Sequence, residues 1–190
     1  MTYDQSELLN RCSKAGEVRM KDRQQSIYER YASEPDAATI TDFACTDSSN
    51  VPANMPLYGE LQIGSWDKIT MPVGVHAAVG GESDYPIPGD ILCGAIAACL
   101  DSTIRIIASR VRVKLKTLSV EVKGTVDVRG TLLIEKTVPV RFQKFDIRVQ
   151  MQAGLVVPGM VLEKILRAAE RSCVVVQSLS KDIEIEIQRV

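Results

Sequence analysis

The chain has 190 residues, a length that suits one domain or one domain with an appendage. Hydrophobic residues make up 45% of it and aromatic residues only 5%, so we expect a core of aliphatic side chains. The net charge is −1 with both signs well mixed, which argues against a nucleic acid or a membrane as partner. Because neither a membrane-spanning stretch nor a secretory signal is evident, we expect a cytoplasmic protein.

The residue types available for chemistry are few. His76 is the only histidine, and no Gly-x-Ser-x-Gly sequence accompanies it, so a Ser-His-Asp hydrolase is a remote alternative. The chain lacks Cys-x-x-Cys pairs, phosphate-binding glycine motifs and clustered histidines, and we therefore expect neither a metal nor a cofactor. Five cysteines, which a reducing cytoplasm keeps as thiols, remain as reactive groups beside the carboxylates.

The N-terminal part is expected to be a helical extension, residues 1–35, followed by a domain at 36–190. Apolar residues are sparse among many charges from residue 4 to about 32, which is typical of an exposed or partner-packed helix. Gly16 is a candidate break, and Pro35 should end the helix. We interpret Cys12 as a small apolar contact.

Short strands should follow the extension. Residues 37–46 are predicted to form one strand, and residues 57–63 and 66–73 a hairpin across Gly64. Trp66 would pack at one edge of this sheet, and Cys45 would be structural. Residues 74–89 have loop composition and directly precede an apolar helix, so they form either a functional loop or a simple connector.

That helix, predicted at about 89–108, is apolar on nearly all sides. Pro88 and Asp90 suit its first turn. Cys99 lies in the middle of an apolar stripe with helical spacing, whereas Cys93 lies about 120° away from it. Such a helix is more apolar than a two-layer domain can cover by itself, which favours a second subunit as cover.

The C-terminal half alternates between strands and one further helix. Residues 111–128 alternate between apolar and charged positions, a turn follows at Arg129-Gly130, and a second strand covers 142–151. Pro139 indicates an irregular or edge segment. A helix at 159–179 carries Cys173 on its apolar stripe, and residues 183–187 form a last strand. The order predicts an α+β fold with an antiparallel sheet and helices on one side.

Several stretches together resemble the OsmC-like family, the osmotically inducible and organic hydroperoxide resistance proteins. The resemblance covers about residues 75–190, and its stretches are Gly80-Gly81-Glu82, 88–100, 127–130, 142–151 and 170–176. It implies antiparallel sheets wrapped around two long central helices in an intertwined homodimer, with active sites at the subunit interface.

The resemblance also implies a chemistry. In peroxide-reducing members the cysteine matching Cys99 attacks the hydroperoxide and the one matching Cys173 resolves it, after which a dithiol reductant restores both. An arginine and a glutamate assist the first thiolate. Gly89 occupies the glutamate position, and no arginine occurs in the early strands, so Glu82, Asp90 and Arg30 are the candidates for the supporting role.

Two functional hypotheses therefore stand beside the reading of both cysteines as core residues. The first is a thiol-dependent peroxidase acting on small organic hydroperoxides in oxidative stress defence, and the cysteine pair favours it. The second is a non-catalytic OsmC-like dimer that binds a small apolar ligand at the subunit interface, and the missing arginine and glutamate favour it.

Overall fold

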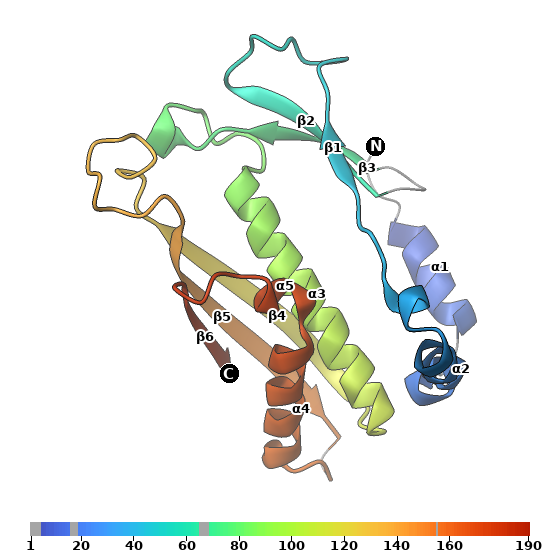
Figure 1. Ribbon diagram of the computed structural model, residues 1–190. Coiled ribbons are helices and arrows are strands. Elements are labelled where there is room, and N and C mark those ends of the chain that lie inside the picture. The colour runs from blue at the N-terminus through green and yellow to red at the C-terminus, as the bar shows by residue number, and fades with distance from the viewer. Residues whose placement is uncertain (1–4, 16–18, 65–68, 155) are drawn as a thin grey trace.

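The computed structural model describes residues 5–15, 19–64, 69–154 and 156–190 (Figure 1). Its N-terminal segment contains two helices, α1 (Gln5–Ala15) and α2 (Met20–Ser33), as the sequence predicts for this polar region. Gly16, the expected break, lies outside the described residues. Pro35 begins a short 3-10 turn, η1 (Pro35–Ala38), rather than a strand.

The first sheet has the order β1-β2-β3 and is antiparallel throughout. The predicted hairpin is confirmed in its pairing, whereas Trp66 falls outside the described residues. The predicted strand 37–46 is wrong over most of its length: η1 occupies its start, and only three of its residues pair. Among the described residues of this sheet, Gly74 alone is buried. The strands are β1 (Ala44–Thr46), β2 (Tyr58–Ile63) and β3 (Ile69–Gly74).

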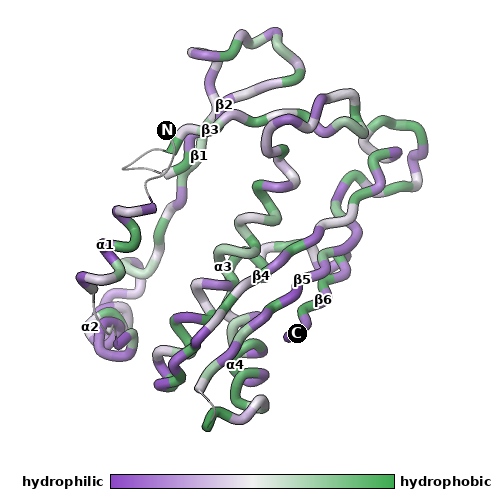
Figure 2. Tube along the Cα trace, turned by 180° about the vertical axis from the view of Figure 1, so that it is seen from behind, coloured by the Kyte–Doolittle hydropathy of each residue, from purple (hydrophilic) through white to green (hydrophobic). Residues whose placement is uncertain are grey.

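The second sheet holds the core. It consists of β4 (Leu115–Val126), β5 (Phe142–Ala153) and β6 (Glu184–Arg189) in the order β4-β5-β6. The strands alternate between hydrophobic and hydrophilic residues, as predicted, so one face is apolar and the other faces water (Figure 2). β4 and β5 pair antiparallel, whereas β6 joins β5 in parallel, a direction that alternation alone does not define.

The central helix α3 (Pro88–Arg110) lies across the apolar face of the second sheet, and the first sheet lies beyond its N-terminal end (Figure 1). Contrary to the sequence-based expectation, α3 is long and apolar enough to span a membrane by length and composition. Its fully buried side chains recur every four residues and pack with the sheet and with α4, the arrangement of a core helix. They are Ile96, Leu100, Ile104 and Ala108.

The last predicted helix, 159–179, is interrupted at Cys173. α4 (Gly159–Ser172) ends there, Cys173 adopts extended backbone angles (φ −79°, ψ 104°), and a short α5 (Val174–Gln177) follows. The three consecutive valines that follow the break are helical and belong to α5. The Gln177 side-chain amide donates to the Glu170 carbonyl at 3.0 Å, replacing the backbone donor that a continuous helix would supply there.

Candidate thiol site

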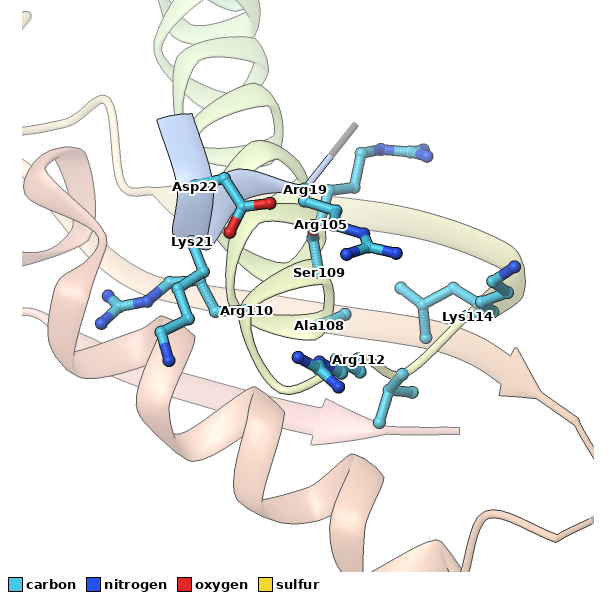
Figure 3. Close-up of a pocket in the computed structure, with 11 residues that line it drawn as sticks. Arg19, Lys21, Asp22, Arg105, Ala108, Ser109, Arg110, Arg112 and Lys114 are labelled. Carbon is cyan, nitrogen blue, oxygen red and sulfur yellow. The ribbon is translucent and has the colours of Figure 1, made fainter. Parts of the chain in front are cut away.

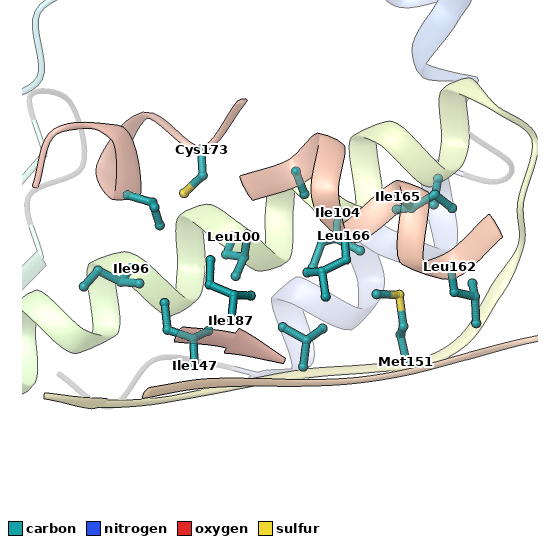
Figure 4. Packing of buried hydrophobic residues seen from close by; sticks show 14 of the residues in the cluster. Ile96, Leu100, Ile104, Ile147, Met151, Leu162, Ile165, Leu166, Cys173 and Ile187 are labelled. Atoms are coloured by element: carbon teal, nitrogen blue, oxygen red, sulfur yellow. The ribbon is translucent and has the colours of Figure 1, made fainter. Parts of the chain in front are cut away.

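Cys99 and Cys173 meet between α3 and the α4–α5 break. The Cys99 thiol is close enough to Cys173 to be one of the groups that raise its pKa, so the two side chains are neighbours. Cys173 is fully buried and lies next to Leu100 (Figure 4), whereas Cys99 is only partly buried at the edge of the same core. The break in the helix is what turns Cys173 towards α3, and the structure thus brings together the two predicted thiols.

The electrostatic environment of Cys173 keeps its proton on the sulfur. Burial raises the pKa of the Cys173 thiol to about 11 from its ordinary value of 9.0, and the neighbouring Cys99 thiol adds to this rise. Backbone N–H groups of Val175 and Val176 act in the opposite direction. None of these groups is a cation, so at neutral pH Cys173 is a proton donor within the pair.

This pKa predicts a loss of stability in alkali. Between pH 9 and pH 11 the unfolded chain releases the Cys173 proton while the folded chain retains it, so the stabilisation present below pH 9 disappears as pH rises. We expect a decrease of roughly 2–3 kcal/mol from this group over that range. Urea unfolding at several pH values, compared between wild type and Cys173→Ala, measures it. Parallel pH profiles of the two proteins would contradict the prediction.

The other cysteines have no thiol partner in the described chain. Burial raises the pKa of Cys93, with a further rise from Asp90 and an opposing effect of the Gly124 backbone. The Cys45 thiol donates to Gln62 Oε1 at 3.8 Å, and Cys12 is exposed on α1. Their interpretation as structural residues stays a prediction. Among the described residues, no group of side chains is arranged to hold a metal.

The three residues predicted to support Cys99 lie in other surroundings than the pair of Cys99 and Cys173. Asp90 caps α3, because its carboxylate accepts the Ile87 N–H at 3.1 Å. Arg30 on α2 forms an ion pair with Glu34, the residue that follows this helix, with 3.6 Å between Nε and Oε2. Glu82 is exposed in the loop before α3. Their role in assisting Cys99 stays a prediction.

The loop before α3 is fixed by contacts that sequence reasoning did not identify. Tyr58 on β2 donates to Asp84 at 3.0 Å, and this hydrogen bond is the main reason that the pKa of Tyr58 is raised. Tyr85 packs edge-on against the same ring at 5.9 Å. A side chain at Gly81 would place its Cβ 2.0 Å from the Val75 carbonyl oxygen, so glycine is required there. The paired Tyr58 and Tyr85, separated by a strand and a loop, gave no recognisable pattern in the sequence.

A long core helix on a mixed sheet, with two neighbouring thiols beside it, defines a cysteine-bearing α+β protein. The sequence model of the family described as OsmC-like protein matches residues 80–188, and the chain belongs to this family. The match contains both thiols, and it begins after the two N-terminal helices and the first sheet.

Solved structures show the same fold. An OsmC-like protein of unknown function from Vibrio cholerae superposes with a TM-score of 0.64 at 14% identity, covering 80% of this chain and all of that one. The organic hydroperoxide resistance protein OsmC from Legionella pneumophila has a TM-score of 0.55 at 14% identity, over 80% and 98% of the two chains. An organic hydroperoxide resistance protein from Elizabethkingia anophelis gives 0.57 at 16%, over 80% and 96%. No curated protein sequence matches the chain.

Proposed function

We propose that the protein reduces organic hydroperoxides through a two-cysteine mechanism in cytoplasmic oxidative stress defence. The observation that carries the proposal is the proximity of the Cys99 and Cys173 thiols at the same core. Membership of the OsmC-like family and structural neighbours named organic hydroperoxide resistance proteins give it further support.

The difference in exposure supports Cys99 as the nucleophile and Cys173 as the resolving cysteine. Cys99 is partly buried and accessible from outside, whereas Cys173 is fully buried behind it. The Cys99 thiolate attacks the peroxide O–O bond, becomes a sulfenic acid and releases the alcohol. The Cys173 thiol then condenses with the sulfenic acid, forming a disulfide and water. A dithiol reductant then reduces the Cys99–Cys173 disulfide by thiol–disulfide exchange. The reductant is itself oxidised to a disulfide, and both protein thiols are restored.

The surroundings of the pair favour an apolar substrate. Leu92, Val175 and Leu179 lie partly buried around the same core as both cysteines. An apolar lining stabilises the organic part of an alkyl or aryl hydroperoxide by burial, and it offers hydrogen peroxide no such gain. We therefore propose that bulky organic hydroperoxides are preferred.

A homodimer completes this proposal, because one chain leaves too much apolar surface uncovered. The first sheet has almost no core of its own, and α3 leaves Gly94, Ala98 and Ser102 exposed along one face. Small residues four apart let two helices approach closely. We propose that this face of α3 packs against a second copy, and that the second subunit supplies a cation beside Cys99.

Consumption of cumene hydroperoxide with dithiothreitol as reductant tests the function. We expect Cys99→Ser to lower the rate at least 100-fold, because the nucleophile is gone, while the matched Cys93→Ser variant keeps the wild-type rate. In the absence of reductant, one equivalent of peroxide should join Cys99 to Cys173 as the disulfide seen by peptide mass mapping. Equal rates for Cys99→Ser and wild type would rule out Cys99 as the nucleophile.

A second candidate function rests on the raised pKa of Cys173 and the lack of a cation among the groups that act on it most. Under this alternative the protein is a non-catalytic dimer that binds a small apolar ligand at the subunit interface. It predicts slow peroxide consumption that does not depend on Cys99, together with saturable binding of an apolar fluorescent probe by the reduced protein.

A further inference from the structure

A cavity that neither Cys99 nor Cys173 lines lies between the beginning of α2, the last turn of α3 and the beginning of β4. Its volume is about 780 Å³, within the usual range for a small-molecule site. Six cationic side chains and a single carboxylate, that of Asp22, line it, and Figure 3 shows them gathered around the end of α3. The cations are Arg19, Lys21, Arg105, Arg110, Arg112 and Lys114.

We propose that this cavity binds a small soluble anion with several negative charges, of the phosphate-ester or polyphosphate class. Arginine suits such a ligand because its planar guanidinium donates two parallel hydrogen bonds to phosphate oxygens. Ala108, Val113 and Leu115 form an apolar part of the lining.

The protein itself neutralises only part of this positive charge. Arg105 pairs with Asp101 at 2.6 Å, and the Arg110 guanidinium stacks over the Tyr28 ring at 5.5 Å. In contrast, Arg19, Lys21 and Arg112 form no ion pair with another described residue.

The dipole of α3 is an alternative explanation for cations at its C-terminus. It corresponds to about half a negative charge, which accounts for one basic residue there. It does not account for six cations gathered from the start of α2, the end of α3 and the turn that leads into β4. An anionic ligand explains the excess.

Docking of α2 onto α3 assembles the cavity. The Met20 N–H donates to Ser109 Oγ at 3.2 Å, and Tyr28 contributes the ring under Arg110. This docking brings Arg19 and Lys21 close to the cations of α3, so like charges repel across the contact. A bound anion would replace this repulsion by attraction, and it would hold the N-terminal helices, which the family match does not include, against the domain.

Titration calorimetry of the full-length protein with pyrophosphate tests the proposal. The double variant Arg19→Gln/Arg112→Gln should bind at least tenfold more weakly than wild type, and the matched single variant Lys136→Gln, an exposed cation outside the cavity, should bind as wild type does. Affinity should fall as NaCl is raised. No measurable binding by wild type, or equal affinity of wild type and the double variant, would overturn the proposal.

Two further measurements make the outcome specific. Pyrophosphate should slow amide hydrogen exchange in α2 of the wild type but not of the double variant, and unchanged exchange in the wild type would count against the assembly of the site by α2. Sedimentation with phosphatidylglycerol vesicles in the absence of pyrophosphate binding would indicate a membrane surface instead and overturn the proposal. The double variant should retain hydroperoxide consumption. A negative result for anion binding would therefore leave the proposed thiol function untouched, and the reverse also holds.

Discussion

Ala98→Arg is expected to separate the proposed dimer into monomers. Ala98 is exposed near the middle of α3, between Gly94 and Ser102, on the face that we propose packs against a second copy. Two arginines would meet across the two-fold axis, where each would be buried without a partner. We expect a loss of about 3 kcal/mol or more of association free energy, about 100-fold in Kd. Light scattering coupled to size-exclusion chromatography at micromolar protein measures the change.

Ala32→Arg provides the matched control, because the same substitution then occupies an exposed position of α2. It should leave the dimer intact. Circular dichroism of both variants checks that the fold is retained. A dimeric Ala98→Arg protein would show that this face of α3 is not the interface, and the cover for the first sheet would have to be found elsewhere.

Loss of the dimer should also lower hydroperoxide consumption if the second subunit supplies the activating cation. Cys99 and Cys173 belong to the same chain and remain neighbours in the monomeric variant. Its activity therefore measures what the thiol pair does without a second subunit. Wild-type activity in a monomeric Ala98→Arg protein would place the activating group in the same chain as the thiols.

Regular patterns in the sequence predicted the central elements well. The helices α3 and α4 and the alternating strands β4 and β5 follow from hydrophobic spacing, because the side chains that each of them buries recur at a regular interval. The family match confirms the resemblance that rested on the segments around Cys99 and Cys173. These features share one cause, because each of them faces the same core.

The mistakes arise where contacts distant in the chain decide the structure. Residues 37–43 have strand-like composition, but η1 occupies their start, and only Ala44–Thr46 of the predicted strand pairs with β2. The break at Cys173 depends on a packing contact with α3 that periodicity does not contain. The basic cavity combines Arg19 and Lys21 with residues 105–114, and only folding brings these segments together.

Leu100→Ala is expected to destabilise the protein by about 3–4 kcal/mol, a large part of the stability of a typical domain. Leu100 is fully buried on α3, next to Cys173 and above the sheet residues Ile147 and Ile187 (Figure 4). Removing its isobutyl group takes away apolar burial and leaves a cavity that helix and sheet, held by their other contacts, close only in part. Urea unfolding at a fixed protein concentration measures the free energy.

Leu9→Ala is the matched control, since Leu9 is 67% exposed on α1 and should change stability by no more than about 0.5 kcal/mol. Leu100→Met, which conserves volume, should cost less than about 1.5 kcal/mol. Because Leu100 packs directly beneath the thiol pair, Leu100→Ala should also let Cys173 move relative to Cys99 and slow formation of their disulfide. A Leu100→Ala protein as stable as the Leu9→Ala control would show that the core is not centred on this contact between α3 and the sheet.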